Sequence, residues 1–376
     1  MSSTPVIIIP AAGQSKLVYA DKKSGKIRNA WPFELDEKAL MDEMKGSLMK
    51  MMLFRTDAGF SDKVAGIVDD ITQPLSVNAD GTKKYDLSAL LSGRSYAECD
   101  EEQKNFINKM YPVSSLAEKT GAENIFYFDY DFLGDISAVA ASLDGLTEAV
   151  VAKTGSEKVS FIVYSTGGAV LKAYLKDYSV KSRVEKVFCV ACALDGASVV
   201  ADVYENKLNL ENPAGLLSSL GGKAASLSSI AGVLPADVIG NVISKSMKVL
   251  DANILGGCTS LYALIPSDRA DAVIASRAMN PQLREKVTAM NEYSKRFADE
   301  VKKLIADGVS FSFICANGKK LPEVFGSAGV DCDGIVDTVS ATLGGAFAEN
   351  TIYIEEGDHF SMLKNEKVRE YIENNI

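Results

Sequence analysis

Short apolar runs alternate along this chain with longer segments in which apolar residues recur at helical spacing. The short runs have the length of buried strands, and the longer segments that of amphipathic helices. We expect strands at residues 6–9, 124–130, 159–164, 184–192, 309–315 and 351–355. We expect helices at 35–53, 99–111, 136–154, 168–178 and 362–373 and a turn at 113–120, while the stretch at 65–77 is too ambiguous to assign. Continuous apolar strands separated by helices predict an α/β fold: a mostly parallel sheet with helices on both faces.

The pattern changes between residues 195 and 308. Strand-like runs stop, helical spacing takes over, and a stretch of small residues follows at 215–232. This segment comes after the strand at 184–192, so it leaves the sheet at the carboxyl edge, where ligands bind in open α/β sheets. We therefore predict a helical lid insertion at 195–308 that divides a core formed by residues 1–194 and 309–376. The alternative is a helical subdomain that packs for stability only.

Composition narrows the class of protein. The 376 residues carry a net charge of −10, which argues against a nucleic-acid partner and against an anchor on an anionic membrane. No apolar run approaches the ~20 residues of a transmembrane segment. Cys189 and Cys192 have metal-site spacing but lie in an apolar run, and the chain has one histidine, so we expect no metal. Six thiols that we interpret as reduced predict a cytoplasmic protein.

The first candidate catalytic residue is Ser165, which lies between the strand at 159–164 and the next helix. A serine at such a turn projects its hydroxyl from the sheet, and the helix N-terminus offers free N–H groups to an anion. The usual elbow is Gly-x-Ser-x-Gly; here Gly167 is present and Val163 replaces the first glycine. An ordinary strand–turn–helix is the alternative. If an imidazole activates Ser165, the base can only be His359, the single histidine.

A catalytic triad also needs an acid, which in α/β-hydrolases lies between the serine and the histidine along the chain. Asp331, Asp333 and Asp337 compete for this role, and we predict Asp333 because a glycine at the turn follows it directly. The alternative is that these aspartates form turns or bind a cation. For the oxyanion hole we predict the amides of Ala12, after the first strand, and of Thr166.

Several segments, in chain order, resemble the lecithin:cholesterol acyltransferase-like α/β-hydrolases. They are Pro5-Val-Ile-Ile-Ile-Pro10, Ser15-Lys16-Leu17, Trp31-Pro32, Phe128-Asp129-Tyr130, Leu261-Tyr-Ala-Leu-Ile-Pro266-Ser267, Asp331-Cys332-Asp333-Gly334 and Gly357-Asp358-His359. The resemblance implies an α/β-hydrolase fold and a lipase, esterase or acyltransferase that acts on a small-molecule or lipid acyl ester. It implies a triad of Ser165, Asp333 and His359 and no cofactor. It indicates no particular oligomeric state.

Two other interpretations stay open. The substitution by Val163 allows a binding protein that keeps the hydrolase fold and has lost catalysis. The run Ala11-Ala12-Gly13-Gln14-Ser15 is also similar to the Gly-rich phosphate loop of nucleotidyltransferases, although Ser15 replaces its second glycine and Leu17 its arginine. Magnesium-dependent nucleotide binding would distinguish this last class.

Overall fold

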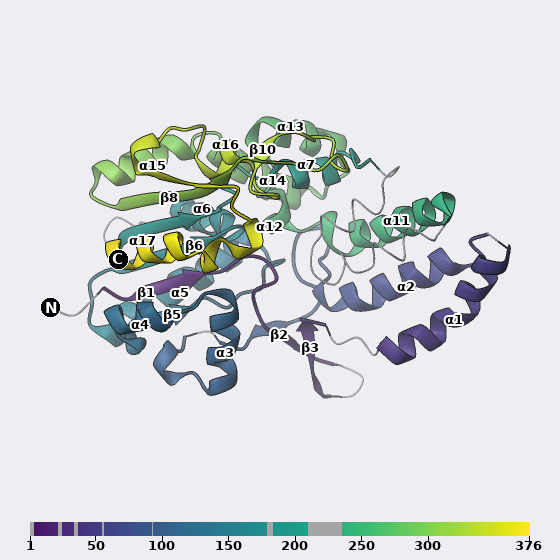
Figure 1. Cartoon of the computed structure of the whole chain (residues 1–376), viewed down its shortest axis with the longest axis horizontal. Coiled ribbons are helices and arrows are strands. Elements are labelled where there is room, and N and C mark those ends of the chain that lie inside the picture. The colour runs from purple at the N-terminus through teal and green to yellow at the C-terminus, as the bar shows by residue number, and fades with distance from the viewer. Residues whose placement is uncertain are drawn as a thin grey trace.

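A six-stranded parallel sheet forms the centre of the molecule (Figure 1). The computed structural model describes residues 4–21, 25–33, 37–54, 56–91, 93–178, 183–209 and 235–376. The strand order is β11-β8-β7-β6-β1-β5, and every neighbouring pair is parallel. The bounds are β1 Val6–Ile9, β5 Ile125–Tyr127, β6 Val159–Tyr164, β7 Val184–Val190, β8 Ser310–Asn317 and β11 Thr351–Glu355. Because all six strands run the same way, their carboxyl ends meet at one edge.

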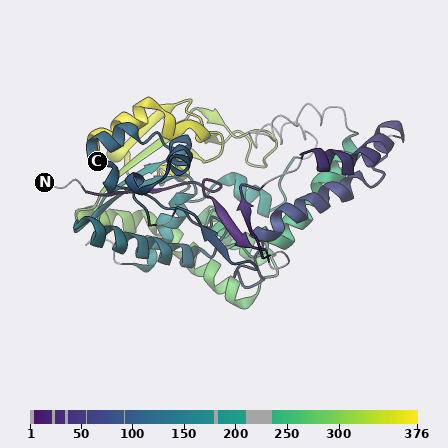
Figure 2. The same ribbon diagram turned by 90° about the horizontal axis from the view of Figure 1, so that it is seen from below.

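Helices cover both faces of this sheet (Figure 2). Side chains alternate along β6, so that Phe161 and Val163 join one core cluster and Ile162 and Tyr164 the other. The first cluster includes residues of α5 Ile136–Thr154, α6 Gly167–Asp177, α14 Pro281–Ser294 and α15 Phe297–Ala306. The second includes residues of α3 Glu101–Met110, α4 Ser114–Thr120 and α17 Glu366–Asn375. This architecture confirms the predicted mostly parallel sheet with helices on both faces.

Some segments match their predicted bounds to the residue, and others differ. The predictions for 6–9, 136–154, 159–164 and 351–355 are confirmed to the residue. The turn predicted at 113–120 is wrong, because residues 114–120 form α4 and bury Leu116. The last predicted helix is two elements, η6 His359–Lys364 and α17, because Asn365 caps α17 by accepting from the amide of Val368. The ambiguous stretch at 65–77 contains most of α2 Phe60–Thr72.

The chain between β1 and β5 builds two additions to the core. One is an antiparallel sheet in the order β3-β2-β4, formed by β2 Leu17–Ala20, β3 Ile27–Trp31 and β4 Leu87–Ala89. The other is a helical arm in which α1 Glu37–Phe54 and α2 pack with α11 Ala236–Leu250. Met51, Phe60 and Val238 are buried together in this arm. Figure 1 shows the helical arm projecting to the side on which the sheet's carboxyl ends lie.

The helices described within residues 195–308 occupy two places. The helix α11 belongs to the helical arm, whereas Tyr293 of α14 and Phe297 of α15 pack in the main core. The small-residue stretch at 215–232 lies outside the described residues. The other elements are η1 Gln73–Leu75, η2 Tyr96–Glu98, η3 Ala122–Asn124, α7 Ser198–Tyr204, η4 Asp251–Leu255, α12 Thr259–Tyr262, α13 Ser267–Ser276, β9 Lys319–Lys320, β10 Asp331–Cys332, α16 Thr338–Ala341 and η5 Ala348–Asn350. Within the described ranges, no helix combines the length and the apolar character needed to span a membrane.

Candidate active site

Ser165 lies at a sharp turn where β6 ends and α6 begins. All six residues of β6 are buried, and the Ser165 amide extends the sheet's hydrogen bonding by donating to the Val190 carbonyl at 3.1 Å. The backbone then turns through a left-handed conformation at Ser165, with φ of 54°. Such a conformation is uncommon for a residue with a side chain and marks strained turns at functional sites. Gly167 allows the turn, since a Cβ there would lie 2.9 Å from the Ile9 carbonyl oxygen.

The structure brings Ser165, His359 and Asp333 into one hydrogen-bonded chain. The Ser165 Oγ lies 2.8 Å from Nε2 of His359, and Nδ1 of His359 lies 2.6 Å from Oδ2 of Asp333. A carboxylate can only accept, so Nδ1 carries the proton and Nε2 presents its lone pair to the serine hydroxyl. The three side chains are 4%, 5% and 2% exposed, respectively. This geometry suits removal of the serine proton by the imidazole.

The turn that carries Asp333 also aims its carboxylate. Oδ1 accepts from the amides of Ile335 and Val336 at 3.0 and 2.8 Å, which leaves Oδ2 for the histidine. Gly334 takes a φ of 108°, a conformation that favours glycine. The His359 amide in turn donates to the Asp333 carbonyl at 3.0 Å, so the two loops are joined through backbone as well as side chains.

The two competing aspartates make other contacts. Asp331 accepts from the Thr338 hydroxyl at 2.6 Å, and this bond lowers the pKa of the Asp331 carboxyl. Asp337 accepts from both the amide and the hydroxyl of Ser198, while burial raises the pKa of its carboxyl. Neither carboxylate has a hydrogen bond to the His359 ring.

Aromatic residues enclose His359 on two sides. The Tyr164 ring stacks on the imidazole at 5.7 Å between centroids, and its hydroxyl donates to the His359 carbonyl. The Phe360 ring meets the imidazole edge-on at 5.6 Å and is itself 60% exposed. Sequence reasoning missed Tyr164 as a site residue. Its position directly before the serine was the only available signal.

The loop after β1 lies beside the elbow. The amide of Ala12 donates to the hydroxyl oxygen of Thr166 at 2.5 Å, so the two predicted oxyanion residues are in direct contact. Ala12 is exposed and Thr166 is half-buried. The side-chain oxygen of Gln14 accepts from the Ala11 amide at 3.0 Å, a hydrogen bond between two residues of this loop.

Residues from two of the motif-like segments hold this loop from outside. The Trp31 indole donates to the Gly13 carbonyl at 2.7 Å, and the Tyr130 hydroxyl donates to the Pro10 carbonyl at 2.9 Å. The Asp129 carboxylate accepts backbone amides, that of Lys16 at 3.1 Å among them. Burial raises the pKa of Asp129 to about 6 despite these donors. The separate segments at 31–32 and 128–130 therefore act on a single loop.

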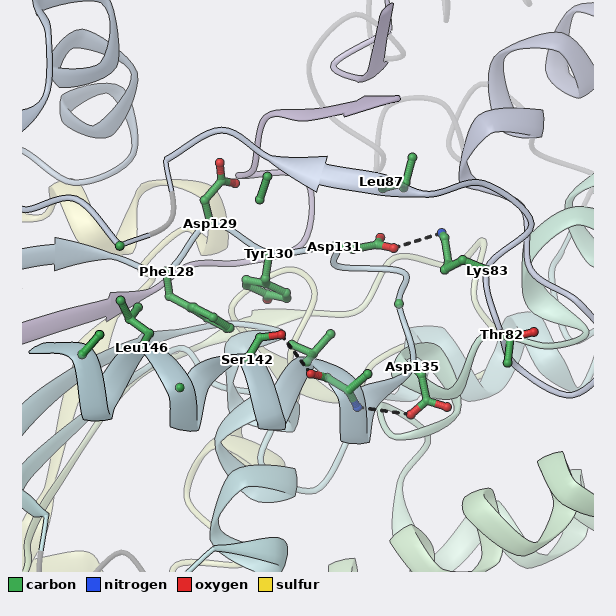
Figure 3. Close-up of a pocket in the computed structure, with 17 residues that line it drawn as sticks. Thr82, Lys83, Leu87, Phe128, Asp129, Tyr130, Asp131, Asp135, Ser142 and Leu146 are labelled. Carbon is green, nitrogen blue, oxygen red and sulfur yellow. Dashed lines mark hydrogen bonds and ion pairs between the residues drawn. The ribbon is translucent and has the colours of Figure 1, made fainter. Parts of the chain in front are cut away.

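A cavity of about 710 Å³ lies next to this region, between α5 and the small sheet (Figure 3). Phe128 and Tyr130 stack on each other at 5.0 Å and extend toward the helix that carries Leu146. An ion pair of 3.3 Å between Lys83 and Asp131 lies along it. No side chain of the Ser165–His359–Asp333 chain lines this cavity.

The cysteines lie outside the hydrogen-bonded chain of Ser165, His359 and Asp333. All six cysteines are buried and unpaired, including Cys189 and Cys192. Among the residues that the structure describes, no three His, Cys, Asp or Glu side chains are grouped so that they could hold a metal ion.

The strand order, the parallel sheet and the left-handed turn at Ser165 together define an α/β-hydrolase fold. No protein-family model and no curated protein matches the chain. Among solved structures it is similar to the Bacillus licheniformis lipase BlEst2 in mature form, with 16% identity, 75% of this chain and 87% of that chain covered, and a TM-score of 0.35. It is also similar to a lipase-esterase related protein from Clostridium acetobutylicum, with 14% identity, coverage of 76% and 91%, and a TM-score of 0.34. For the Tle4–Tli4 complex the identity is 10%, the coverage 98% and 97%, and the TM-score 0.44. These values are too low to assign a family or an activity.

Proposed function

We propose that the protein is a serine hydrolase that cleaves acyl esters through Ser165, His359 and Asp333. The observation that carries the proposal is the continuous hydrogen-bonded chain, 2.8 Å from serine to imidazole and 2.6 Å from imidazole to carboxylate. An imidazole held between a hydroxyl and a carboxylate is the arrangement that activates a serine nucleophile.

The proposed reaction has two stages. In the first, Nε2 of His359 takes the proton of Ser165, whose Oγ attacks the ester carbonyl carbon. The oxyanion accepts from the amides of Ala12 and Thr166, and the imidazolium, stabilised by Asp333, gives its proton to the leaving alcohol. In the second, water or an acceptor alcohol loses a proton to His359 and attacks the acyl carbonyl carbon. The bond from that carbon to Oγ then breaks, and His359 returns the proton to Oγ, which releases the acid or new ester and restores Ser165.

The catalytically inactive binding protein is the main alternative, and Val163 was its basis. Val163 is fully buried in the core cluster of α5 and α6 and pairs with Ile9 and Cys189 in the sheet. Ser165 nevertheless has the left-handed φ and the hydrogen bond to His359. The presence of both features beside Val163 favours an active enzyme over an inactive relative.

The nucleotidyltransferase interpretation loses support at the loop after β1. A phosphate-binding loop needs backbone amides that are free to donate. Here the Ala11 amide donates to Gln14 and the Lys16 amide to Asp129. The protein itself therefore uses amides that a nucleotide would require.

We further propose an enzyme similar to the lecithin:cholesterol acyltransferase-like lipases and esterases, with a lid over the carboxyl edge of the sheet. The segments at 31–32 and 128–130 support this, since both hold the oxyanion loop. Helix α11, which belongs to the insertion predicted at 195–308, packs in the helical arm on the side toward which the strands' carboxyl ends point, which is where a lid would act.

Ester turnover tests the proposal. We expect the wild type to hydrolyse p-nitrophenyl esters and Ser165→Ala to lose roughly 10³-fold or more of that rate. Ser160→Ala is the matched control, since Ser160 is a buried residue of β6, the strand that leads to Ser165, and its hydroxyl has no hydrogen-bond partner. Equal rates for Ser165→Ala and wild type would reject the proposal, and an inert wild type would favour the binding protein.

A further inference from the structure

The oxyanion hole that we propose is occupied by a group of the protein itself. Ala12 and Thr166 would supply the two amides that bind the oxyanion. In the structure the Ala12 amide donates instead to Oγ1 of Thr166, at 2.5 Å. The threonine oxygen therefore accepts the bond that an ester oxygen would accept during the reaction.

The Thr166 oxygen can only accept in this contact, because a backbone N–H donates. Toward Ala12 the Thr166 hydroxyl is therefore an acceptor, as an oxyanion would be. On the same loop, the Tyr130 hydroxyl donates to the Pro10 carbonyl at 2.9 Å.

The position of Thr166 in α6 makes this contact unusual. Thr166 is the N-cap residue of the helix, where a threonine hydroxyl commonly accepts from the helix's own first amides. Here the side chain makes no such bond. The hydroxyl therefore serves the contact between the helix start and the loop after β1, rather than the helix itself.

We infer that the Thr166 hydroxyl fills the oxyanion hole of the free enzyme and is displaced by the carbonyl oxygen of the ester. The inference rests on the proposed hydrolase function and adds a gating residue to it. Displacement exchanges one acceptor for another at the Ala12 amide, and no covalent bond of Thr166 changes. Rotation of the Thr166 side chain would move Oγ1 away while the Thr166 amide stays in place for the oxyanion. Substrates whose binding favours this rotation would be selected.

The rate of inactivation by a fluorophosphonate tests the inference, because the phosphonyl oxygen must enter the same hole. Thr166→Ala removes the competing oxygen, so its second-order labelling rate should exceed that of wild type by about 3- to 10-fold, the factor of an ordinary net hydrogen bond. Thr166→Ser keeps the hydroxyl and should label at close to the wild-type rate. In ¹⁵N-labelled protein the Ala12 amide proton should shift upfield in Thr166→Ala but not in Thr166→Ser.

Each result has a distinct consequence. If wild type is labelled and Thr166→Ala is labelled more slowly, the hydroxyl donates to the oxyanion and the inference is wrong, while the hydrolase function stands. Equal rates, or an unshifted Ala12 amide, would also overturn the inference alone. If neither protein is labelled although both fold, the proposed function and the inference are rejected together.

Discussion

At the scale of single residues, neighbouring groups hold the proposed catalytic side chains in position. Oδ1 of Asp333 accepts two backbone amides, so Oδ2 is left for His359. The Tyr164 hydroxyl donates to the His359 carbonyl, so the backbone of the proposed base is held as well. Each contact removes a rotation that would otherwise separate the groups, and such preorganisation is a condition for triad chemistry.

The first prediction concerns the acid. Asp333→Asn should lower ester turnover by about 10⁴-fold, the cost of the comparable change in a serine protease, because the imidazole loses its orienting acceptor. Asp331→Asn is the matched control, since its carboxylate contacts Thr338 and not His359. Steady-state kinetics of both variants would check this. A larger loss in Asp331→Asn than in Asp333→Asn would contradict the assignment.

Sequence reasoning proposed the residues of this chain but not their supports. Ser165 lies at a recognisable strand–helix junction and His359 is the single histidine, so both follow from local pattern and count. Tyr164 and Tyr130 act through hydrogen bonds to His359 and Pro10, which are 195 and 120 positions away in the chain. Because these partners are distant in the chain, the local pattern does not predict the two contacts.

At the scale of elements, the close approach of α6 to the end of β1 shapes the site. Gly167 begins α6, and a Cβ there would lie 2.9 Å from the Ile9 carbonyl oxygen and 3.0 Å from that of Pro10. Both obstacles are backbone, so the loop after β1 would have to move. The same loop carries Ala12, which makes the spacing of these two elements part of the proposed oxyanion hole.

The second prediction tests that spacing. Gly167→Ala should destabilise the protein by about 1–3 kcal/mol, as overpacking does, and should lower ester turnover by displacing Ala12. Gly145→Ala is the matched control in α5, where an added Cβ meets nothing within 4 Å and the change should stabilise by roughly 0.5–1 kcal/mol. Denaturant unfolding and turnover would be measured for both. A fully active and stable Gly167→Ala variant would show that the close approach is unimportant.

Elements could be predicted where the apolar pattern fits one kind of structure. The predicted bounds of α5 and β6 are confirmed to the residue, because α5 repeats its apolar positions over 19 residues and β6 is a nearly continuous apolar run. The seven residues of α4 are too few for a period to emerge. The helical arm could not be foreseen, because its partners α2 and α11 are far apart in sequence and meet only in the folded chain.

At the scale of the whole molecule, a charge lies inside the core. Lys172 of α6 is fully buried, and its Nζ donates to the Leu194 carbonyl at 3.1 Å, at the end of the segment that follows β7. A second carbonyl, that of Ala263, lies 3.5 Å away. Burial lowers the pKa of Lys172 to about 8, although the nearby Asp195 carboxylate opposes the shift.

The third prediction follows from this lysine. The folded protein holds the Lys172 proton less tightly than the unfolded chain does, so the free energy of unfolding should increase as pH rises from about 8 to about 10.5. The expected gain is on the order of 3 kcal/mol, at ~1.4 kcal/mol per pKa unit. Lys172→Met should flatten that rise, and Lys176→Met, a partly exposed lysine of the same helix, should not. Urea unfolding across this pH range would check it; identical profiles for Lys172→Met and wild type would contradict it.

The central claim is that Ser165 is a nucleophile activated by His359. Incubation with a fluorophosphonate, followed by proteolysis and mass mapping, tests it most directly. We predict one adduct per chain, on the peptide that contains Ser165, and no adduct in Ser165→Ala or in His359→Asn. Absence of an adduct from folded wild-type protein, or an adduct that persists in Ser165→Ala, would contradict the claim.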